Sequence, residues 1–405
     1  MKQIPGGVTA PKGFRAWGVH CGVKSKKADK KDLALILSDQ ECAAAAVYTM
    51  NRVKAAPLYV TMEHLEDGTA WGVAANSGNA NACCPMSHEY AEEMARLAAR
   101  ATGRAPADFV VASTGVIGQV LPMEPIQAGI PELVKSLSAQ GSHAAATAIM
   151  TTDTLPKEAA AEVEIGGKTV KVGGISKGSG MIHPNMATML CFVTTDCAIS
   201  PAMLDKAIHQ VTEKTFNMIS IDGDTSTNDT FAILANGAAG NPEITAPGPD
   251  YDAFVQALEA VCRTLSKLMA GDGEGATKLL ICQVDGAATL DMARTVAKSV
   301  ICSTLFKAAM FGADANWGRV LCAIGYSGAA VDVHAVDVAF ASAAGSIDVC
   351  RNGAGIPVDE DKAKGILSEK EIVIDIRLHD GDAAAVAFGC DLTYEYVKIN
   401  GDYRS

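Results

Sequence analysis

The chain has 405 residues, of which 49% are hydrophobic and 20% charged, a composition that excludes a disordered or fibrous protein. Its 34 lysines and arginines against 46 aspartates and glutamates give a net charge of −12, which disfavours a nucleic-acid partner because that affinity depends on neutralising phosphates. No apolar run approaches the roughly 20 residues that span a bilayer, and residues 1–7 lack the apolar core of a signal peptide. We therefore expect a cytoplasmic protein with no membrane partner.

The 12 cysteines are scattered along the chain and form no Cys-x-x-Cys pair. Some of them, such as Cys282 and Cys302, sit in apolar runs, where a free thiol behaves as a small hydrophobe. Without a secretion signal, reduced thiols are expected rather than disulfides. The 8 histidines are dispersed, and none lies at ligand spacing from another, so the sequence predicts no metal site.

The first clear elements lie in the amino-terminal half of the chain. Apolar side chains over residues 94–101 fall on one helical face, and Gly103 is a typical stop for that helix. Alternating apolar residues over 161–172 flank Gly166 and Gly167, a pattern that predicts a hairpin.

The carboxy-terminal half shows the same mixture. A helix is expected from Pro201 onward, with Ser200 as its N-cap, and another over 254–261. Alternation at 374–378 and at 392–396 predicts two half-exposed strands. Because strands and helices interleave without a regular βαβ rhythm, we expect a layered α/β or α+β fold.

The most unusual segment is glycine-rich and runs over residues 173–190. Its Gly173 and Gly178 have the spacing of a phosphate-binding P-loop, but Ser179-Gly180 stands where the Lys-Ser/Thr pair should follow. The similar stretch 271–278 also fails this pattern. The residues therefore disfavour a nucleotide-binding loop.

Three residue sets have an ordinary structural interpretation when they are taken by themselves. Thr188 stands near the start of an apolar, strand-like run over 187–193, and threonine fits strands well. Ser113-Thr114-Gly115 is typical of a turn at the end of a strand. Glu274 lies in a glycine-rich loop, where a solvated surface side chain is usual.

A family resemblance changes these interpretations. Residues 177–182 followed by 186–190 resemble the self-cleavage and nucleophile motif of the bacterial ornithine acetyltransferases, the glutamate N-acetyltransferases of the cyclic arginine pathway. Further blocks resemble the same family in the same order along the whole chain, namely 75–83, 113–118, 150–154, 220–229, 271–278, 312–319 and 400–402. The resemblance implies an ornithine acetyltransferase-like fold of mixed sheets packed with helices.

The resemblance also implies that the chain cuts itself between Ala187 and Thr188. The hydroxyl of Thr188 would attack the preceding carbonyl group, and water would open the resulting ester. The products would be an α chain, residues 1–187, and a β chain, residues 188–405, which share one core. The new α-amino group, with a pKa near ~8, would then serve as the base for the threonine hydroxyl.

Acetyl transfer would follow a ping-pong course from N2-acetylornithine, through an acetyl ester on Thr188, to L-glutamate. Thr114 and Gly115 are implied to form the oxyanion hole, where losing one donor usually costs ~10²–10³ in rate. The residues implied to bind substrate are Thr151, Lys177, Thr188, Glu274, Asn400 and Ser405.

Charge suits these ligands, with one difficulty. Lys177 can meet an α-carboxylate, and Glu274 can meet the ornithine ammonium. The side-chain carboxylate of glutamate would be repelled by an ionised Glu274, so that side chain is protonated, screened by a water or cation, or avoided by a different pose. The chain ends in Ser405, whereas members of the family often end in threonine. The sequence also departs from the family after Cys83, where Cys84 begins the pair of residues that is more usually Thr-Gly, in a loop to which we assign no role.

The resemblance implies no bound cofactor and an α2β2 heterotetramer, and it leaves acetyl-CoA open as a second acetyl donor. The main alternative is a self-cleaving aminopeptidase of the same superfamily, which would hydrolyse its acyl-enzyme. Those enzymes use serine as the nucleophile and lack the blocks around Lys177, Glu274 and Asn400, so these residues favour the transferase. A non-catalytic relative with a degenerate site is disfavoured because the motif residues are intact.

Overall fold

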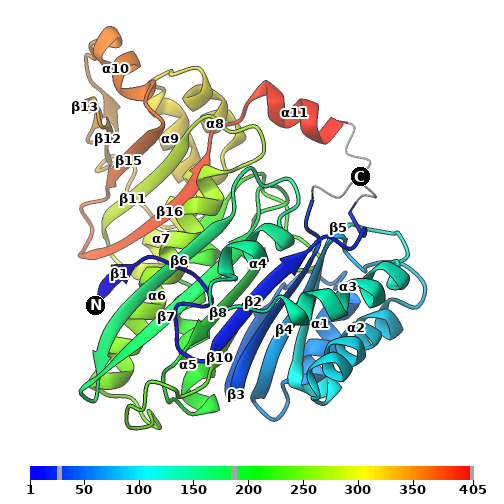
Figure 1. The fold of residues 1–405 in the computed structure, drawn as a ribbon. Coiled ribbons are helices and arrows are strands. Elements are labelled where there is room, and N and C mark those ends of the chain that lie inside the picture. The colour runs from blue at the N-terminus through cyan, green and yellow to red at the C-terminus, as the bar shows by residue number, and fades with distance from the viewer. Residues whose placement is uncertain (25–29, 184–188, 402–405) are drawn as a thin grey trace.

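The computed structural model describes residues 1–24, 30–183 and 189–401 (Figure 1). In this part of the chain, two mixed sheets and the helices that cover them make up the protein. The prediction of a layered α/β fold of mixed sheets is therefore confirmed. None of the described helices combines the length and the apolarity that a membrane crossing requires.

The first sheet contains nine strands of the described chain in the order β1-β6-β7-β8-β10-β3-β4-β5, with β2 also paired to β3. Their bounds are β1 Lys2–Ile4, β2 Phe14–Val19, β3 Leu33–Tyr48, β4 Thr69–Asn79, β5 Phe109–Val116, β6 Lys157–Ile165, β7 Lys168–Lys177, β8 Leu190–Thr195 and β10 Thr230–Ala235.

The long strand β3 changes partners halfway along its length. Its first part, up to Ser38, pairs with β2 and β4, whereas its last part, from Ala43, pairs with β10. The exposed residues 39–41 lie between them, and the pairing with β4 resumes only at Cys42 and Ala43. Side chains from β4 and β5 meet those of β8 and β10 in one buried cluster, which includes Val73, Val110, Phe192 and Leu234. The two parts of the sheet therefore lie face to face across this core.

Helices cover the outer faces of the folded sheet. One core cluster joins β3, β4 and β5 to the helices α1 Ala56–His64, α2 Ser87–Thr102 and α3 Met123–Lys135. Another joins β6, β7, β8 and β10 to α5 Pro201–Thr212 and α6 Pro249–Gly271. Helix α4, Ser142–Ile149, packs against β2 and β3, and two single turns of 3₁₀ helix are η1 Pro106–Asp108 and η2 Phe216–Met218.

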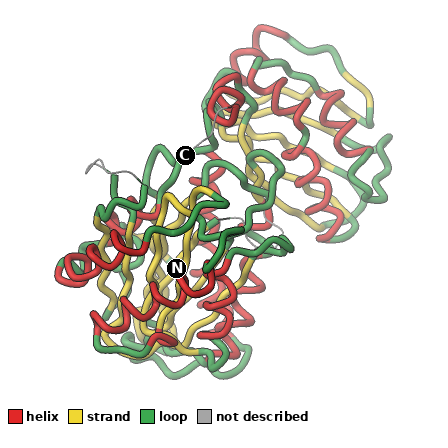
Figure 2. The backbone as a smooth tube through the Cα atoms, turned by 90° about the vertical axis from the view of Figure 1, so that its right-hand side faces the viewer, coloured by secondary structure: helices red, strands yellow, loops and turns green. Residues whose placement is uncertain are grey.

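The second sheet contains seven described strands in the order β14-β13-β12-β15-β11-β16-β9. Figure 2 shows the strands of the two sheets as two separate groups. Helix α6 lies between the sheets, since it contacts β6 and β7 as well as β11 and β16 (Figure 1). The strands are β9 Ile219–Ser220, β11 Leu279–Ala287, β12 Asp337–Ser342, β13 Gly345–Arg351, β14 Ala354–Gly355, β15 Glu371–Arg377 and β16 Ala383–Cys390. The remaining helices are α7 Leu290–Cys302, α8 Thr304–Phe311, α9 Trp317–Gly325, α10 Glu360–Leu367 and α11 Tyr394–Gly401.

Most of the predicted elements are confirmed. Helix α2 ends at Gly103, which has a φ of +70°, and α5 begins behind Ser200, whose hydroxyl accepts a hydrogen bond from the Met203 N–H group. The hairpin turns at Gly166 and Gly167, both with positive φ, and joins β6 to β7. The expected helix over 254–261 lies within α6. The strand expected over 374–378 is β15, which begins three residues earlier, at Glu371, and ends one residue earlier, at Arg377.

The predicted strand over 392–396 is wrong, because residues from Tyr394 onward form helix α11. The hydroxyl of Thr393 accepts a hydrogen bond from the Tyr396 N–H group at 3.2 Å, as an N-cap does at the start of a helix. No neighbouring strand pairs with Tyr394, and α11 is also held by the edge-to-face contact of the Tyr394 ring with Phe311 and by the hydrogen bond from the Tyr396 hydroxyl to Asp222.

All 12 cysteines are free thiols in the structure. Cys282 is buried in the second core, as an apolar run suggests. Cys302 is only half-buried, and its Sγ lies 3.4 Å from Nδ1 of His183. This cysteine therefore has a polar partner that the sequence pattern did not indicate.

Candidate active site

A small cavity lies where several strand ends of the first sheet meet. It is lined by Thr114 near the end of β5, Lys177 at the end of β7, Leu190 at the start of β8, and Asp229 just before β10. Because β8 and β10 are parallel, their amino-terminal ends lie side by side at this edge of the sheet. The other described lining residues are Gly180, Met181, Ile182, Met189, Ser226 and Asn228.

Thr114 and Gly115 reach this cavity because β5 runs parallel to β4. They are in register with Ser77 and Gly78 of that strand. Gly115 has a φ of +131°, and a Cβ atom there would lie 2.3 Å from the carbonyl carbon of Gly78. Glycine is therefore required at residue 115, and this close approach of β5 to β4 fixes the position of Thr114 in the cavity wall.

Lys177 is buried, and its positive charge acts on the buried carboxylate of Asp153. Asp153 accepts hydrogen bonds from Lys157 Nζ at 2.6 Å, from the Gly178 N–H group at 2.7 Å and from the Thr151 N–H group at 3.0 Å. Burial by itself would raise the pKa of Asp153, but the charges of Lys177 and Lys157 and these hydrogen bonds outweigh it and hold the pKa well below its usual range. The carboxylate therefore remains ionised beside Lys177.

Lys157 connects this group to a second acid. Its ammonium group is completely buried, and it lies 2.6 Å from Asp272 as well as from Asp153. Asp272 also accepts hydrogen bonds from the main-chain N–H and the hydroxyl group of Thr154. The network thus joins the segment 151–154, the start of β6 and the loop after α6 behind Lys177.

Glu274 lies in that loop after α6 and is only 9% exposed. Its N–H group donates to the Ser179 carbonyl at 2.8 Å, and its Oε2 accepts a hydrogen bond from the side-chain amide of Asn400 at 2.7 Å. A Cβ atom on Gly180 would lie 2.3 Å from the same Oε2. Because Gly180 also lines the cavity, the Glu274 carboxylate lies directly against its wall.

The described residues of the predicted site are thus connected in space. Thr114 and Lys177 line the cavity itself, Glu274 contacts it through Gly180, and Asn400 contacts Glu274. Thr151 joins this group through the hydrogen bond from its N–H group to Asp153. Ala187, Thr188 and Ser405 lie outside the described residues, so the roles expected for them stay predictions.

Sequence reasoning missed several charged residues around the cavity. Asp153 and Asp272 belong to the family-like blocks, but only their burial shows that they are paired with Lys157. The spacing of Asp153 and Lys157, four residues apart, was the one available signal. Lys24 was missed as well: burial lowers its pKa to about 8, although the charge of Asp32 opposes that shift.

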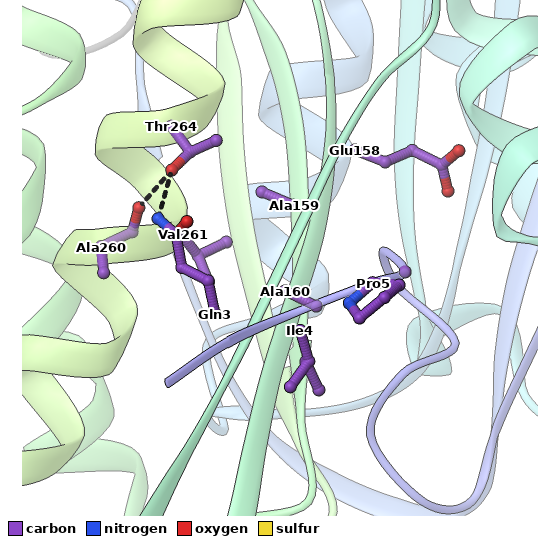
Figure 3. A pocket seen from close by; sticks show the side chains of 10 residues that line it. Gln3, Ile4, Pro5, Glu158, Ala159, Ala160, Ala260, Val261 and Thr264 are labelled. Carbon is purple, nitrogen blue, oxygen red and sulfur yellow. Dashed lines mark hydrogen bonds between the residues drawn. The ribbon is translucent and has the colours of Figure 1, made fainter. Parts of the chain in front are cut away.

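A separate cavity lies between β1, β6 and α6 (Figure 3). There the side-chain amide of Gln3 donates to the Thr264 hydroxyl at 3.3 Å, and Thr264 donates in turn to the Ala260 carbonyl. Among its described lining residues only Glu158 is charged, and no predicted site residue belongs to them. The candidate chemistry therefore lies at the first cavity.

The fold and the site define a layered α/β protein with Thr114, Lys177 and Asp229 in the wall of one small cavity. A family model described as the ArgJ family matches residues 15–405, and the chain belongs to this family. It is 54% identical to the arginine biosynthesis bifunctional protein ArgJ of Symbiobacterium thermophilum, over 100% of both chains. It is 47% identical to the protein of that name from Bacillus subtilis, over 100% of this chain and 98% of the other.

A solved structure agrees with this assignment. The crystal structure of arginine biosynthesis bifunctional protein argJ from Bacillus halodurans is 44% identical to this chain, with a TM-score of 0.50. The match covers 98% of that solved chain but 52% of this one. The solved chain therefore corresponds to about half of the present sequence.

Proposed function

We propose that this protein is a glutamate N-acetyltransferase of arginine biosynthesis, which moves acetyl from N2-acetylornithine to L-glutamate through an acetyl ester on Thr188. The observation that carries the proposal is that Thr114 and Lys177 line one cavity together with Met189, the residue after Thr188. The whole-length identity to proteins named for arginine biosynthesis supports the same activity. Because those relatives are named bifunctional, acetyl-CoA is proposed as a second acetyl donor.

We assign each residue of the site a role that suits its charge. Thr114 and the Gly115 main chain would stabilise the oxyanion that forms at the acetyl carbonyl. Lys177 would bind the α-carboxylate of both amino acids, while Thr151, Asn400 and Ser405 would complete the substrate site. Glu274 would bind the ornithine ammonium. Because two carboxylates repel each other, glutamate is proposed to bind with its side-chain carboxylate turned away from Glu274.

Maturation is proposed to occur by cleavage between Ala187 and Thr188, followed by use of the new α-amino group as the base. The sheet explains how the two products would stay together. Strand β7, before the cut, pairs with β8 after it from Lys177–Leu190 to Val172–Thr195, and β3 pairs with β10. The half-length solved chain of the Bacillus halodurans relative supports cleavage. We also propose a cytoplasmic α2β2 assembly with no bound cofactor.

Denaturing intact-mass spectrometry of the purified protein tests this proposal first. The expected result is two fragments, the second beginning at Thr188, whereas the Thr188→Ala variant should stay whole and transfer no acetyl. Thr114→Ala should be folded and should lose ~10²–10³ in transfer rate. A cleaved and active Thr188→Ala protein would contradict the mechanism. Hydrolysis of the acyl donor without transfer to glutamate would favour the aminopeptidase alternative.

A further inference from the structure

Asp229 is a buried acid in the cavity wall that none of the roles above uses. It is only 2% exposed, and its Oδ2 has no hydrogen-bond partner within the part of the chain that the structure describes. The residue is held in place by its neighbour, since the Asn228 amide donates to the carbonyls of Ala80 and Ser113. Ser113 directly precedes Thr114, so Asp229 and Thr114 reach the cavity from segments that are bonded to each other.

The cavity thus contains two very different carboxyl environments. Asp153, behind Lys177, is satisfied by a lysine and two main-chain N–H groups. Asp229 lines the cavity, and its buried Oδ2 lacks a donor among the described residues. Burying an ionised carboxylate is costly when its hydrogen bonds do not replace the hydration it loses, and such a group holds its proton more tightly. Two carboxyl groups in contrasting environments commonly mark different chemical roles in one site.

The electrostatics agree with this contrast. Burial raises the pKa of Asp229 well above its usual range. Hydrogen bonds from Ser226, Thr49 and the Met189 main chain and the positive charge of Lys177 oppose this shift but do not offset it. Lys177, at the end of β7, is the charged side chain that acts on it across the cavity. Asp229 therefore keeps its proton to a higher pH than a solvent-exposed aspartic acid does, and in that form its hydroxyl group is a hydrogen-bond donor.

We propose that Asp229 is a further catalytic residue, whose protonated carboxyl group donates a hydrogen bond from Oδ2 to the acyl oxygen of the substrate. This proposal rests on the proposed acyl transfer and adds a side-chain donor to the Thr114 hydroxyl and the Gly115 main chain. It names the recognised group as an uncharged acyl carbonyl that becomes an oxyanion. No proton is transferred in this step. The hydrogen bond from Asp229 strengthens while the acyl oxygen carries negative charge, and it weakens when the carbonyl group re-forms.

Two variants of Asp229 test whether its side chain acts as a hydrogen-bond donor. Asp229→Asn keeps the shape and an N–H donor, so kcat should stay within about 5-fold of wild type, whereas Asp229→Ala should lose ~10²-fold in kcat with KM nearly unchanged. The exposed Asp224→Ala is the matched control and should behave as wild type. Mass spectrometry should confirm the same chain composition in every preparation. A kcat of Asp229→Ala within 3-fold of wild type, or an Asp229→Asn protein as slow as Asp229→Ala, would overturn the proposal.

The dependence of kcat on pH distinguishes this role from a merely structural one. As pH rises and Asp229 ionises, its donor is lost and its charge opposes the oxyanion, so wild-type kcat should fall at high pH. The asparagine variant cannot ionise and should lack this alkaline fall. If kcat of Asp229→Asn falls at high pH as it does in the wild type, that fall belongs to another group and the proposal is contradicted.

Infrared difference spectroscopy tests the protonation state without any catalytic activity. At pH 7 the wild-type protein should show a carbonyl stretch of a protonated carboxylic acid that is absent from Asp229→Asn. That band should shift when N2-acetylornithine is added. Absence of the band overturns the Asp229 proposal, whereas an intact band in a protein that transfers no acetyl overturns the proposed function instead.

Discussion

The side-chain amide of Asn400 donates a hydrogen bond to Oε2 of Glu274 at 2.7 Å, across 126 residues of sequence. Asn400 is exposed on α11, whereas Glu274 is buried against the cavity wall. The same amide also donates to the Tyr396 carbonyl one helical turn earlier. The last described helix therefore contacts the Glu274 carboxylate from outside the cavity, and we expect its position to affect any ligand that Glu274 binds.

Neutralising Glu274 should weaken the use of ornithine-type substrates. Glu274→Gln keeps the shape but removes the charge, so kcat/KM for N2-acetylornithine should fall by ~10²-fold because an ammonium group loses its buried ion partner. Asn400→Ala leaves the carboxylate in place and should cost less, about 5–10-fold. The exposed Glu395→Gln on the same helix is the control. Equal kcat/KM values for Glu274→Gln and this control would remove Glu274 from the substrate site.

The buried lysine between two acids should dominate local stability. Lys157→Met leaves Asp153 and Asp272 without their shared cation, which should lower the free energy of unfolding by about 3–5 kcal/mol at pH 7. Lys398→Met removes an exposed lysine paired with Glu395 and should change it by less than ~1 kcal/mol. Urea unfolding of both variants measures the difference. A Lys157→Met protein as stable as wild type would show that the pair contributes nothing net.

Acid should weaken the same network in the wild-type protein. The folded pKa of Asp153 is depressed, so its contribution to stability is complete above the unfolded value of about 3.9 and is lost as pH falls below it. Unfolding measured from pH 7 downward should therefore show a steep acid loss. In Asp153→Asn the slope below about pH 4 should be shallower, from a lower starting stability at pH 7. An identical acid slope in both proteins would assign the loss to other carboxylates.

Local signals predicted most of the elements that local bonds create. The hairpin at Gly166-Gly167 depends on two positive φ angles, and the start of α5 depends on the Ser200 cap, both of which are sequence-adjacent effects. The strand expected over 392–396 failed for the same reason, because the Thr393 cap outweighs an alternating pattern that no neighbouring strand uses. The bend of β3 could not be predicted, since it depends on partners far along the chain.

The site shows the same division between local and distant information. The residues by themselves favoured a surface position for Glu274, but the structure buries it, because Ser179 and Asn400 bond to it from distant segments. Only the family resemblance singled out Thr114 and Lys177, which the fold brings to one cavity. The pairing of Lys157 with Asp272 spans 115 residues, and the unpartnered oxygen of Asp229 is visible only once the core is packed.

His183 should give the protein a second pH-dependent component of stability. Burial lowers its pKa to about 4, and the charge of Lys298 acts in the same direction, while Asp222 opposes it. Between about pH 6.5 and 4 the unfolded chain binds a proton that folded His183 does not, so the free energy of unfolding falls as pH decreases through this window. His183→Gln should lose that component, whereas the exposed His209→Gln should keep it. Superimposable pH profiles for His183→Gln and wild type would contradict this assignment.

Alanine variants of Gly118 and Gly115, which both have a positive φ, distinguish the cost of backbone strain from the cost of a steric clash. Gly118→Ala meets no atom within 4 Å, so it should cost only the strain of a φ of +82°, about 1 kcal/mol. Gly115→Ala adds the same kind of strain and also forces a Cβ atom against the Gly78 main chain, so its cost in unfolding free energy should be clearly larger. It should also lower acetyl transfer by ~10²-fold or more, because Thr114 must move with the displaced strand. Thermal unfolding and transfer rates of the two proteins give the comparison, and equal losses in both would mean that the close approach of β4 and β5 does not position the site.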